Sequence, residues 1–160
     1  MAIGEPRNRI SEKALKVWKI SGAISSAIYL SISITAIILI NIFDWPKWII
    51  PIIVVLWVLK SYYSIFFSPK LRWKRWRYEV RDQEIELQYG LFVVTKTLIP
   101  MIRVQHVDTS QGPLLKKYKL ASISISTAAT VHEIPALEEE EAEELRHFIS
   151  RLARIAEDDI

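Results

Sequence analysis

Cysteine is absent from the sequence, and glycine occurs only four times in 160 residues. Without cysteine there is no disulfide framework and no thiolate metal site. No glycine-rich phosphate loop and no Gly-x-Ser-x-Gly turn are present. The three histidines, His106, His132 and His147, are 26 and 15 residues apart, and no His-Glu-x-x-His motif joins two of them. We therefore expect no catalytic residues, no metal and no cofactor.

Charge is also missing from a long stretch. Ile20–Phe43 is 24 residues without a charged side chain. At ~1.5 Å per residue it spans ~36 Å as a helix, more than the ~30 Å hydrocarbon core of a bilayer. After a short break at Asp44–Lys47, Trp48–Phe67 is again apolar and carries one charge, Lys60. The sequence predicts a two-helix transmembrane hairpin over 20–67. A cytoplasmic N-terminal segment over 1–19 precedes it, and we expect no cleavage of the kind that removes a signal peptide.

Two features inside the hairpin have alternative explanations. Small residues recur at four-residue spacing in the first span, as in Gly22 and Ser26, and such residues let helices approach closely in lipid. Packing within the hairpin is favoured over contact with another membrane protein. An intramembrane charge is a functional candidate, but Lys60 has no carboxylate partner in either span. We expect its side chain to reach toward the interface.

A basic, aromatic stretch follows the hairpin. Residues 1–81 carry thirteen Lys/Arg and four Asp/Glu, net +9, whereas residues 82–160 carry eight and fourteen, net −6. The positive flanks place both termini in the cytoplasm. Basic clusters with aromatics also occur in nucleic-acid binders, but lipid headgroups are the nearer polyanion here, so we expect no nucleic-acid partner. The predicted membrane-surface contacts are Lys70, Arg72, Trp73, Lys74 and Arg75.

The remainder, 68–160, is predicted to be a cytoplasmic domain of strands followed by one helix. Alternating or β-branched runs indicate the strands: Arg75–Arg81, Glu84–Gln88, Leu91–Ile99, Met101–Val107, Leu120–Thr127 and Thr130–Pro135. Leu114–Lys119 is a short basic connection. Leu137–Ala156 has an apolar helical stripe of Leu145, Phe148, Ile149, Leu152 and Ile155, and this stripe must be buried on the sheet.

Two segments carry a family resemblance. Ile99–Leu114 (IPMIRVQHVDTSQGPL), followed by Leu120–Ala128 (LASISISTA), resembles the bacterial pleckstrin-homology-domain membrane proteins, in particular the YdbS-like branch with two spans and one such domain. The resemblance implies an α+β membrane protein with a PH-like split β-barrel of about seven strands, capped by the C-terminal helix, and no catalytic residues. This sequence differs from the family pattern at Lys119 and Ala129, where the family usually has glycine. Members commonly accompany a larger relative with several such domains.

These observations favour a membrane-anchored PH-like interaction module at the cytoplasmic face of the cell membrane, assembling with a larger related membrane protein. The alternative is a module that senses anionic lipid. Partner assembly predicts an exposed strand face, as in Ser122–Thr127. Lipid sensing predicts a basic pocket that includes Lys116, Lys117 and Lys119, which are candidate partner or lipid contacts. An enzyme would need a convergent polar cluster, and the sequence offers none.

The topology can be tested with single cysteines, because the chain has none of its own. With both termini cytoplasmic, Lys47→Cys should react with an impermeant thiol reagent in intact cells and Asp158→Cys should not. The opposite labelling pattern would reverse the orientation.

Overall fold

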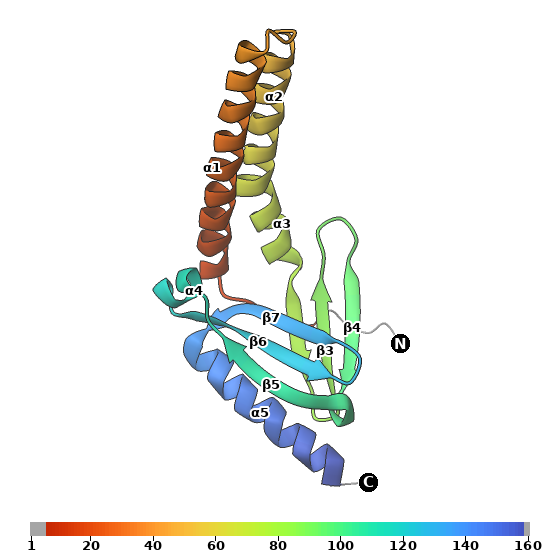
Figure 1. Cartoon of the computed structure of the whole chain (residues 1–160). Helices are drawn as coiled ribbons and strands as arrows, with labels where there is room; N and C mark the ends of the chain where they lie inside the picture. Colours follow the sequence, from red (N-terminus) through yellow and green to blue (C-terminus); the bar gives the residue numbers. More distant parts are fainter. Residues whose placement is uncertain (1–5, 159–160) are drawn as a thin grey trace. The chain divides into compact units, whose positions relative to one another are not determined.

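The computed structural model describes residues 6–158 (Figure 1). The chain divides into two compact units. One is the helical hairpin, Leu15–Leu71. The other, called here the PH-like unit, combines the residues up to Ala14 with those from Arg72 onward. The hairpin is therefore inserted within the sequence of the PH-like unit.

The hairpin consists of consecutive helical segments: α1 (Lys13–Ile42), α2 (Ile49–Tyr62), the π-helical turn η1 (Tyr63–Phe67) and α3 (Ser68–Arg75). Two continuous helices, Lys13–Ile42 and Ile49–Arg75, are long and apolar enough to cross a membrane. The predicted turn at Asp44–Lys47 separates them, and Asp44 adopts a positive φ of 48° there.

The two helices pack through small residues, as the spacing predicted. A β-carbon added to Gly22 would lie 2.6 Å from the Ser64 carbonyl oxygen, so only glycine allows this approach. The Ser26 and Ser61 hydroxyls are 2.6 Å apart, and the Trp57 indole donates a 3.1 Å hydrogen bond to the Ser26 carbonyl. Close backbone contact and interhelical hydrogen bonds are what hold helices together in lipid.

Lys60 has an aromatic neighbour that the sequence did not reveal. Its ammonium group lies over the ring of Tyr29 on the other helix. A cation over an aromatic face is stabilised by the ring quadrupole, and more so where water is scarce. The contact gives Lys60 an interaction within the hairpin without a carboxylate.

The second helix extends beyond Phe67, where the sequence predicted the hairpin to end. The helix continues through Pro69 to Arg75. The π-helical turn just before the proline explains this, since the Ser68 N–H bonds to the Tyr63 carbonyl five residues back. Such a wider turn absorbs the irregularity that a proline introduces.

The PH-like unit is built from two antiparallel sheets (Figure 1). The first has the order β1 (Asn8–Arg9), β2 (Arg77–Val80), β3 (Glu84–Tyr89) and β4 (Thr95–Pro100), and the second has the order β5 (Val104–Ser110), β6 (Leu120–Thr127) and β7 (Val131–Glu138). The connections include the 3-10 turn η2 (Met101–Arg103) and the short helix α4 (Pro113–Lys117). Seven strands and a terminal helix confirm the predicted fold class.

Two strand predictions need correction. β4 begins at Thr95 rather than Leu91, because Gly90, with φ of +139°, starts a tight loop in which residues 91–94 do not pair. The strand expected from Met101 begins at Val104, because Met101–Arg103 form a 3-10 turn. In both cases an apolar run with a strand-like composition lies outside the sheet. Such a composition reflects how well side chains pack on a sheet, and it does not by itself fix the backbone as a strand.

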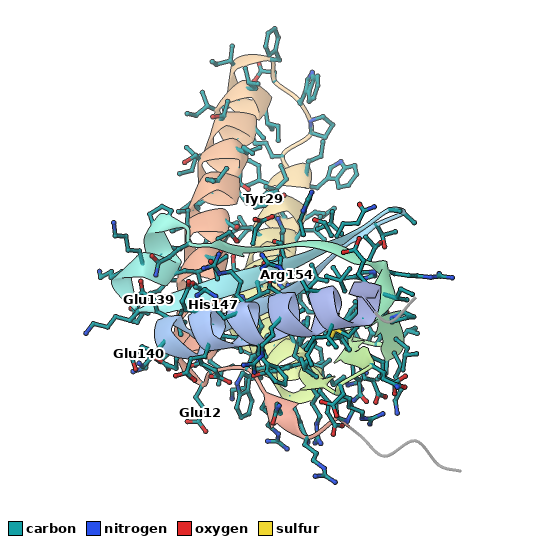
Figure 2. The ribbon with its side chains drawn as sticks, turned by 90° about the horizontal axis from the view of Figure 1, so that it is seen from below. Glu12, Tyr29, Glu139, Glu140, His147 and Arg154 are labelled. Atoms are coloured by element: carbon teal, nitrogen blue, oxygen red, sulfur yellow. The ribbon has the colours of Figure 1, made fainter. Side chains whose placement is uncertain are left out.

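Helix α5 (Glu139–Asp158) packs on the second sheet and η2. Ala142 and Ile149 are fully buried, Phe148 and Leu152 are half-buried, and Ile155 is 51% exposed. The apolar stripe is therefore docked along its centre and open at its far end. Figure 2 shows Glu139 and Glu140 at the start of α5 and Arg154 farther along it.

The N-terminal segment, which we expected to be a lead-in to the first span, is part of the PH-like unit. Ile10 is only 2% exposed, and Ser11 donates its N–H to the Ala136 carbonyl at 3.1 Å. The Glu138 carboxylate accepts the Ser11 hydroxyl at 2.7 Å and the Lys13 ammonium at 2.9 Å. The Ser11 hydroxyl also accepts the Lys13 N–H at 3.2 Å, as the side chain of a helix N-cap residue does. We call Pro6–Lys13 the N-terminal clasp.

The docking of α5 can be tested by comparing a buried and an exposed position. Ile149→Ala should lower the melting temperature of the PH-like unit sharply, because removing a buried aliphatic side chain costs about 2–5 kcal/mol of a domain's total of about 5–15 kcal/mol. Phe148→Ala should cost less, since Phe148 is half-buried. Thermal unfolding of the full chain in mild detergent, followed by near-ultraviolet circular dichroism, measures this. An effect no larger than that of the exposed Glu140→Ala would mean that α5 is not docked.

The N-terminal clasp should contribute a pH-dependent stability. Hydrogen bonds from Lys13 and then Ser11 lower the pKa of Glu138, so its contribution is present above the unfolded-state pKa and is lost as the pH falls through the folded-state pKa. Because the pair is partly exposed, Glu138→Gln should cost only about 0.2–1 kcal/mol at neutral pH. The difference in melting temperature from wild type should shrink and vanish as the pH falls through the lowered pKa of Glu138. A difference independent of pH, or one matched by Glu139→Gln, would contradict this role.

Candidate membrane-surface and partner-contact sites

The five residues predicted to contact the membrane surface all lie on α3. The side chains of Lys70, Arg72 and Lys74 are exposed, whereas Trp73 and Arg75 are half-buried. Their backbone follows the apolar span directly, because α3 begins at the residue after Phe67. Three exposed cations and one tryptophan on eight residues form a short helix that suits an anionic headgroup layer.

Trp73 and Arg75 also make contacts within the protein. The Trp73 indole donates a 3.2 Å hydrogen bond to the Ser11 carbonyl, and the Arg9 guanidinium lies 5.8 Å from the centre of its ring. Arg75 donates a 3.1 Å hydrogen bond to the Phe92 carbonyl in the β3–β4 loop. The end of α3 is thus joined to the N-terminal clasp on one side and to this loop on the other.

The second set of candidates, Lys116, Lys117 and Lys119, lies on and just after α4. All three side chains are exposed, and none forms an ion pair within residues 6–158. The backbone here is fixed: Lys119 donates to the Lys116 carbonyl at 3.1 Å and accepts from the Glu139 N–H at 3.0 Å. These lysines form a solvated basic patch at the entry to the second sheet.

Lys119 stands where the resemblance led us to expect glycine, and its backbone is of the kind that glycine favours. Its φ is +54°, in the left-handed region that glycine adopts without penalty. A lysine there costs of order 1 kcal/mol or more, and the two backbone hydrogen bonds help to hold it. The other departure from the family, Ala129, lies in an exposed turn.

The strand face expected to receive a partner is only partly exposed. Ser122–Thr127 lies in β6, the central strand of the second sheet, paired on both sides. Ser122 is 3% exposed, and its hydroxyl accepts the Ala136 N–H at 3.4 Å. Pairing closes both edges of β6, but Ser124 and Ser126 on the serine face are half-buried, so contact of a partner with this face stays a prediction.

A cavity in the PH-like unit, with a volume of about 950 Å³, lies beside α5. Asn8 and Tyr78 come from the first sheet, and residues from Glu141 to Ile155 come from the helix. The Tyr78 hydroxyl donates a 2.6 Å hydrogen bond to Glu141. Burial first, and then this hydrogen bond, raises the pKa of Tyr78, so the phenol keeps its proton. We call this cavity the α5 groove.

Both signs of charge line the α5 groove. Glu141 and Glu144 lie toward the start of the helix, Arg151 and Arg154 lie toward its end, and Phe148 is among the apolar residues. A second cavity of about 420 Å³, beside η2 and the β6–β7 turn, includes Arg103 and His132. Neither cavity includes Lys116, Lys117 or Lys119 in its lining. Neither therefore matches the basic pocket that lipid sensing predicted around these lysines.

No metal centre is evident in the part of the chain that the structure describes, since no three His, Asp or Glu side chains gather there. The three histidines lie on β5, β7 and α5. His132 pairs with the Thr130 hydroxyl at 2.8 Å, and His147 lies 3.3 Å from Glu143.

Comparison with known proteins supports the architecture. The family described as "Bacterial PH domain" matches residues 22–153. The chain is 56% identical over 156 residues, 98% of each chain, to "UPF0699 transmembrane protein YdbS" of Bacillus subtilis (strain 168). It is 32% identical over 83 residues to "UPF0699 transmembrane protein YdbT" of the same organism, covering 49% of this chain and 17% of that one. No solved structure matches significantly.

The family match extends over most of the chain, the two apolar helices fit the transmembrane relatives, and the resemblance read from Ile99–Leu114 and Leu120–Ala128 is confirmed. The chain therefore belongs to the bacterial PH-domain family and is a membrane protein of the UPF0699 group.

Proposed function

We propose that the chain is a membrane-anchored PH-like interaction module at the cytoplasmic face, and that it assembles with a larger membrane protein carrying related PH-like domains. Both termini lie in the cytoplasm in this proposal, and the cytoplasmic domain consists of residues 68–160 together with the N-terminal clasp. Lys70, Arg72, Trp73, Lys74 and Arg75 rest on the membrane surface. The α5 groove receives the partner, and Lys116, Lys117 and Lys119 are a second contact for the partner or for lipid.

The observation that carries this proposal is the mixed charge of the α5 groove. An anionic headgroup needs converging cations, but here carboxylates and guanidiniums lie along one wall with apolar side chains between them. A protein surface that carries the opposite charges in the same order is the better complement, because opposite potentials that meet across an interface favour one partner over others. The acidic balance of residues 82–160, net −6, also disfavours an anionic surface as the main ligand.

The hairpin adds a second argument. Two membrane-spanning helices anchor a chain far more strongly than headgroup contacts can. Lipid binding by the PH-like unit would add little to attachment, so its cavities are free to serve another purpose. The larger relative is about three times as long as this chain, because the same matched stretch is 49% of one and 17% of the other. A family with one compact and one extended member suits an assembly of related domains.

Co-purification tests the assembly. The tagged full chain, cross-linked in native membranes and purified in mild detergent, should retain a larger membrane protein with PH-like domains, identified by mass spectrometry. Arg151→Glu with Arg154→Glu should reduce its recovery at least about tenfold, as expected when charges at a complementary interface are reversed. Lys116→Glu with Lys117→Glu makes the same charge change on α4 and serves as the matched control.

The other outcomes of the co-purification experiment would each contradict or change this proposal. Recovery of no such protein with the wild-type chain would contradict the assembly. Loss of the partner in the α4 variant alone would move the contact from the α5 groove to the lysines. Anionic lipid that is retained through purification and lost in Lys116→Ala with Lys117→Ala would support lipid sensing instead.

A further inference from the structure

The loop between β3 and β4 is unusually apolar for an exposed hairpin tip. It consists of Leu91-Phe92-Val93-Val94, and Phe92, Val93 and Val94 are 72%, 77% and 44% exposed. Hairpin tips in water are normally built from glycine, asparagine, aspartate or serine. Figure 1 shows this loop projecting beyond β2 and beyond the second sheet of the same unit. Four consecutive apolar residues at a projecting tip call for an apolar surrounding.

The loop is held in place by its base. Gly90, at φ +139°, makes a reversal so tight that a β-carbon there would lie 1.8 Å from the Val93 carbonyl oxygen. The ring of Tyr89 stacks on buried Trp76 with centroids 5.8 Å apart. Arg75 bonds to the Phe92 carbonyl at 3.1 Å. Because that bond is made to the backbone, it fixes the loop and leaves the Phe92 and Val93 side chains exposed.

Chain connectivity limits how far this loop can lie from lipid. Arg75 is the last residue of α3, which begins directly after Phe67, the end of the apolar span. Eight helical residues extend ~12 Å, and the headgroup layer on each side of the hydrocarbon core is ~5–7 Å thick. The guanidinium bonded to the loop is therefore tethered within a short distance of the interface by the covalent chain alone.

The chemistry of the loop also favours lipid over protein. A stable protein interface needs ~800 Å² on each partner, far more than a four-residue tip offers. A bilayer needs no matching surface, and apolar side chains flanked by cations are the pattern that enters the boundary between headgroups and acyl chains. Here the flanking cations are Arg75 and the exposed Lys96.

We propose that the β3–β4 loop inserts Phe92 and Val93 into the headgroup–acyl boundary of the membrane that the hairpin crosses. The PH-like unit then has two attachments to one leaflet, the covalent one through α3 and the loop. Two separated attachments restrict the rotation of the unit about α3, so that its remaining surface faces the cytoplasm in a fixed orientation. This inference does not depend on the assembly proposed above.

A fluorescent reporter can test the insertion in the full chain, because no native cysteine interferes. Val93→Cys is labelled with an environment-sensitive dye and reconstituted in vesicles of phosphatidylcholine and phosphatidylglycerol. The matched control is Asp82→Cys, in the exposed β2–β3 turn at the other end of β3. Shallow doxyl-labelled lipids should quench the dye at Val93 at least about twofold, with a blue-shifted emission, and should leave the dye at Asp82 unchanged.

A second variant checks that the side chains cause the effect. Phe92→Ser in the Val93→Cys background should weaken the quenching, whereas Leu98→Ser, an apolar and half-exposed position within β4, should not. Equal quenching at Val93 and Asp82, or none at either, would overturn the proposal. A blue shift without lipid quenching, growing with the protein-to-lipid ratio, would also overturn it and would assign the loop to a contact between two copies of the chain.

Discussion

The pairing of β1 with β2 is the constraint on which the rest of the structure depends. Asn8 and Arg9 precede the hairpin and Arg77 and Tyr78 follow it, yet they are neighbours in one antiparallel ladder. Two residues that share a ladder must lie on the same side of a membrane, because backbone hydrogen bonds cannot form across it. Both ends of the hairpin must therefore lie on the same side of the membrane. The N-terminal clasp strengthens this closure, since Ile10 is buried and Ser11 bonds to β7.

The distribution of charge follows from this arrangement. Basic residues gather where the chain enters and leaves the hairpin, and the acidic residues are concentrated in the PH-like unit. Some of the cations also have structural partners: Lys13 bonds to Glu138, and Arg75 bonds to the β3–β4 loop. Both of these contacts lie within the PH-like unit, close in sequence to the points where the chain enters and leaves the hairpin. The α5 groove differs in that carboxylates and guanidiniums both line it.

Local sequence and tertiary structure disagree at five places. Leu91–Val94 and Met101–Arg103 have strand-like composition but form a loop and a 3-10 turn. Ser122–Thr127 alternates like an exposed strand but is the central one. Lys119 and Ala136 adopt the positive φ that glycine prefers. In each case neighbouring elements impose a geometry that the local residues alone do not favour, and the apolar loop is where this leaves hydrophobic side chains in the open.

The sequence by itself determined the hairpin, the strand-rich domain, the terminal helix and the family. Those features rest on long apolar runs, alternation, helical periodicity and a specific motif, all of which are local along the chain. The sequence also identified the candidate cations, because they are clustered along the chain. Only the tertiary structure decided that Pro6–Lys13 belongs to the PH-like unit, that Lys60 lies over Tyr29, and that β6 is central. Those facts depend on pairs of residues that are distant in sequence, such as Ser11 and Glu138, and no periodic pattern encodes such pairs.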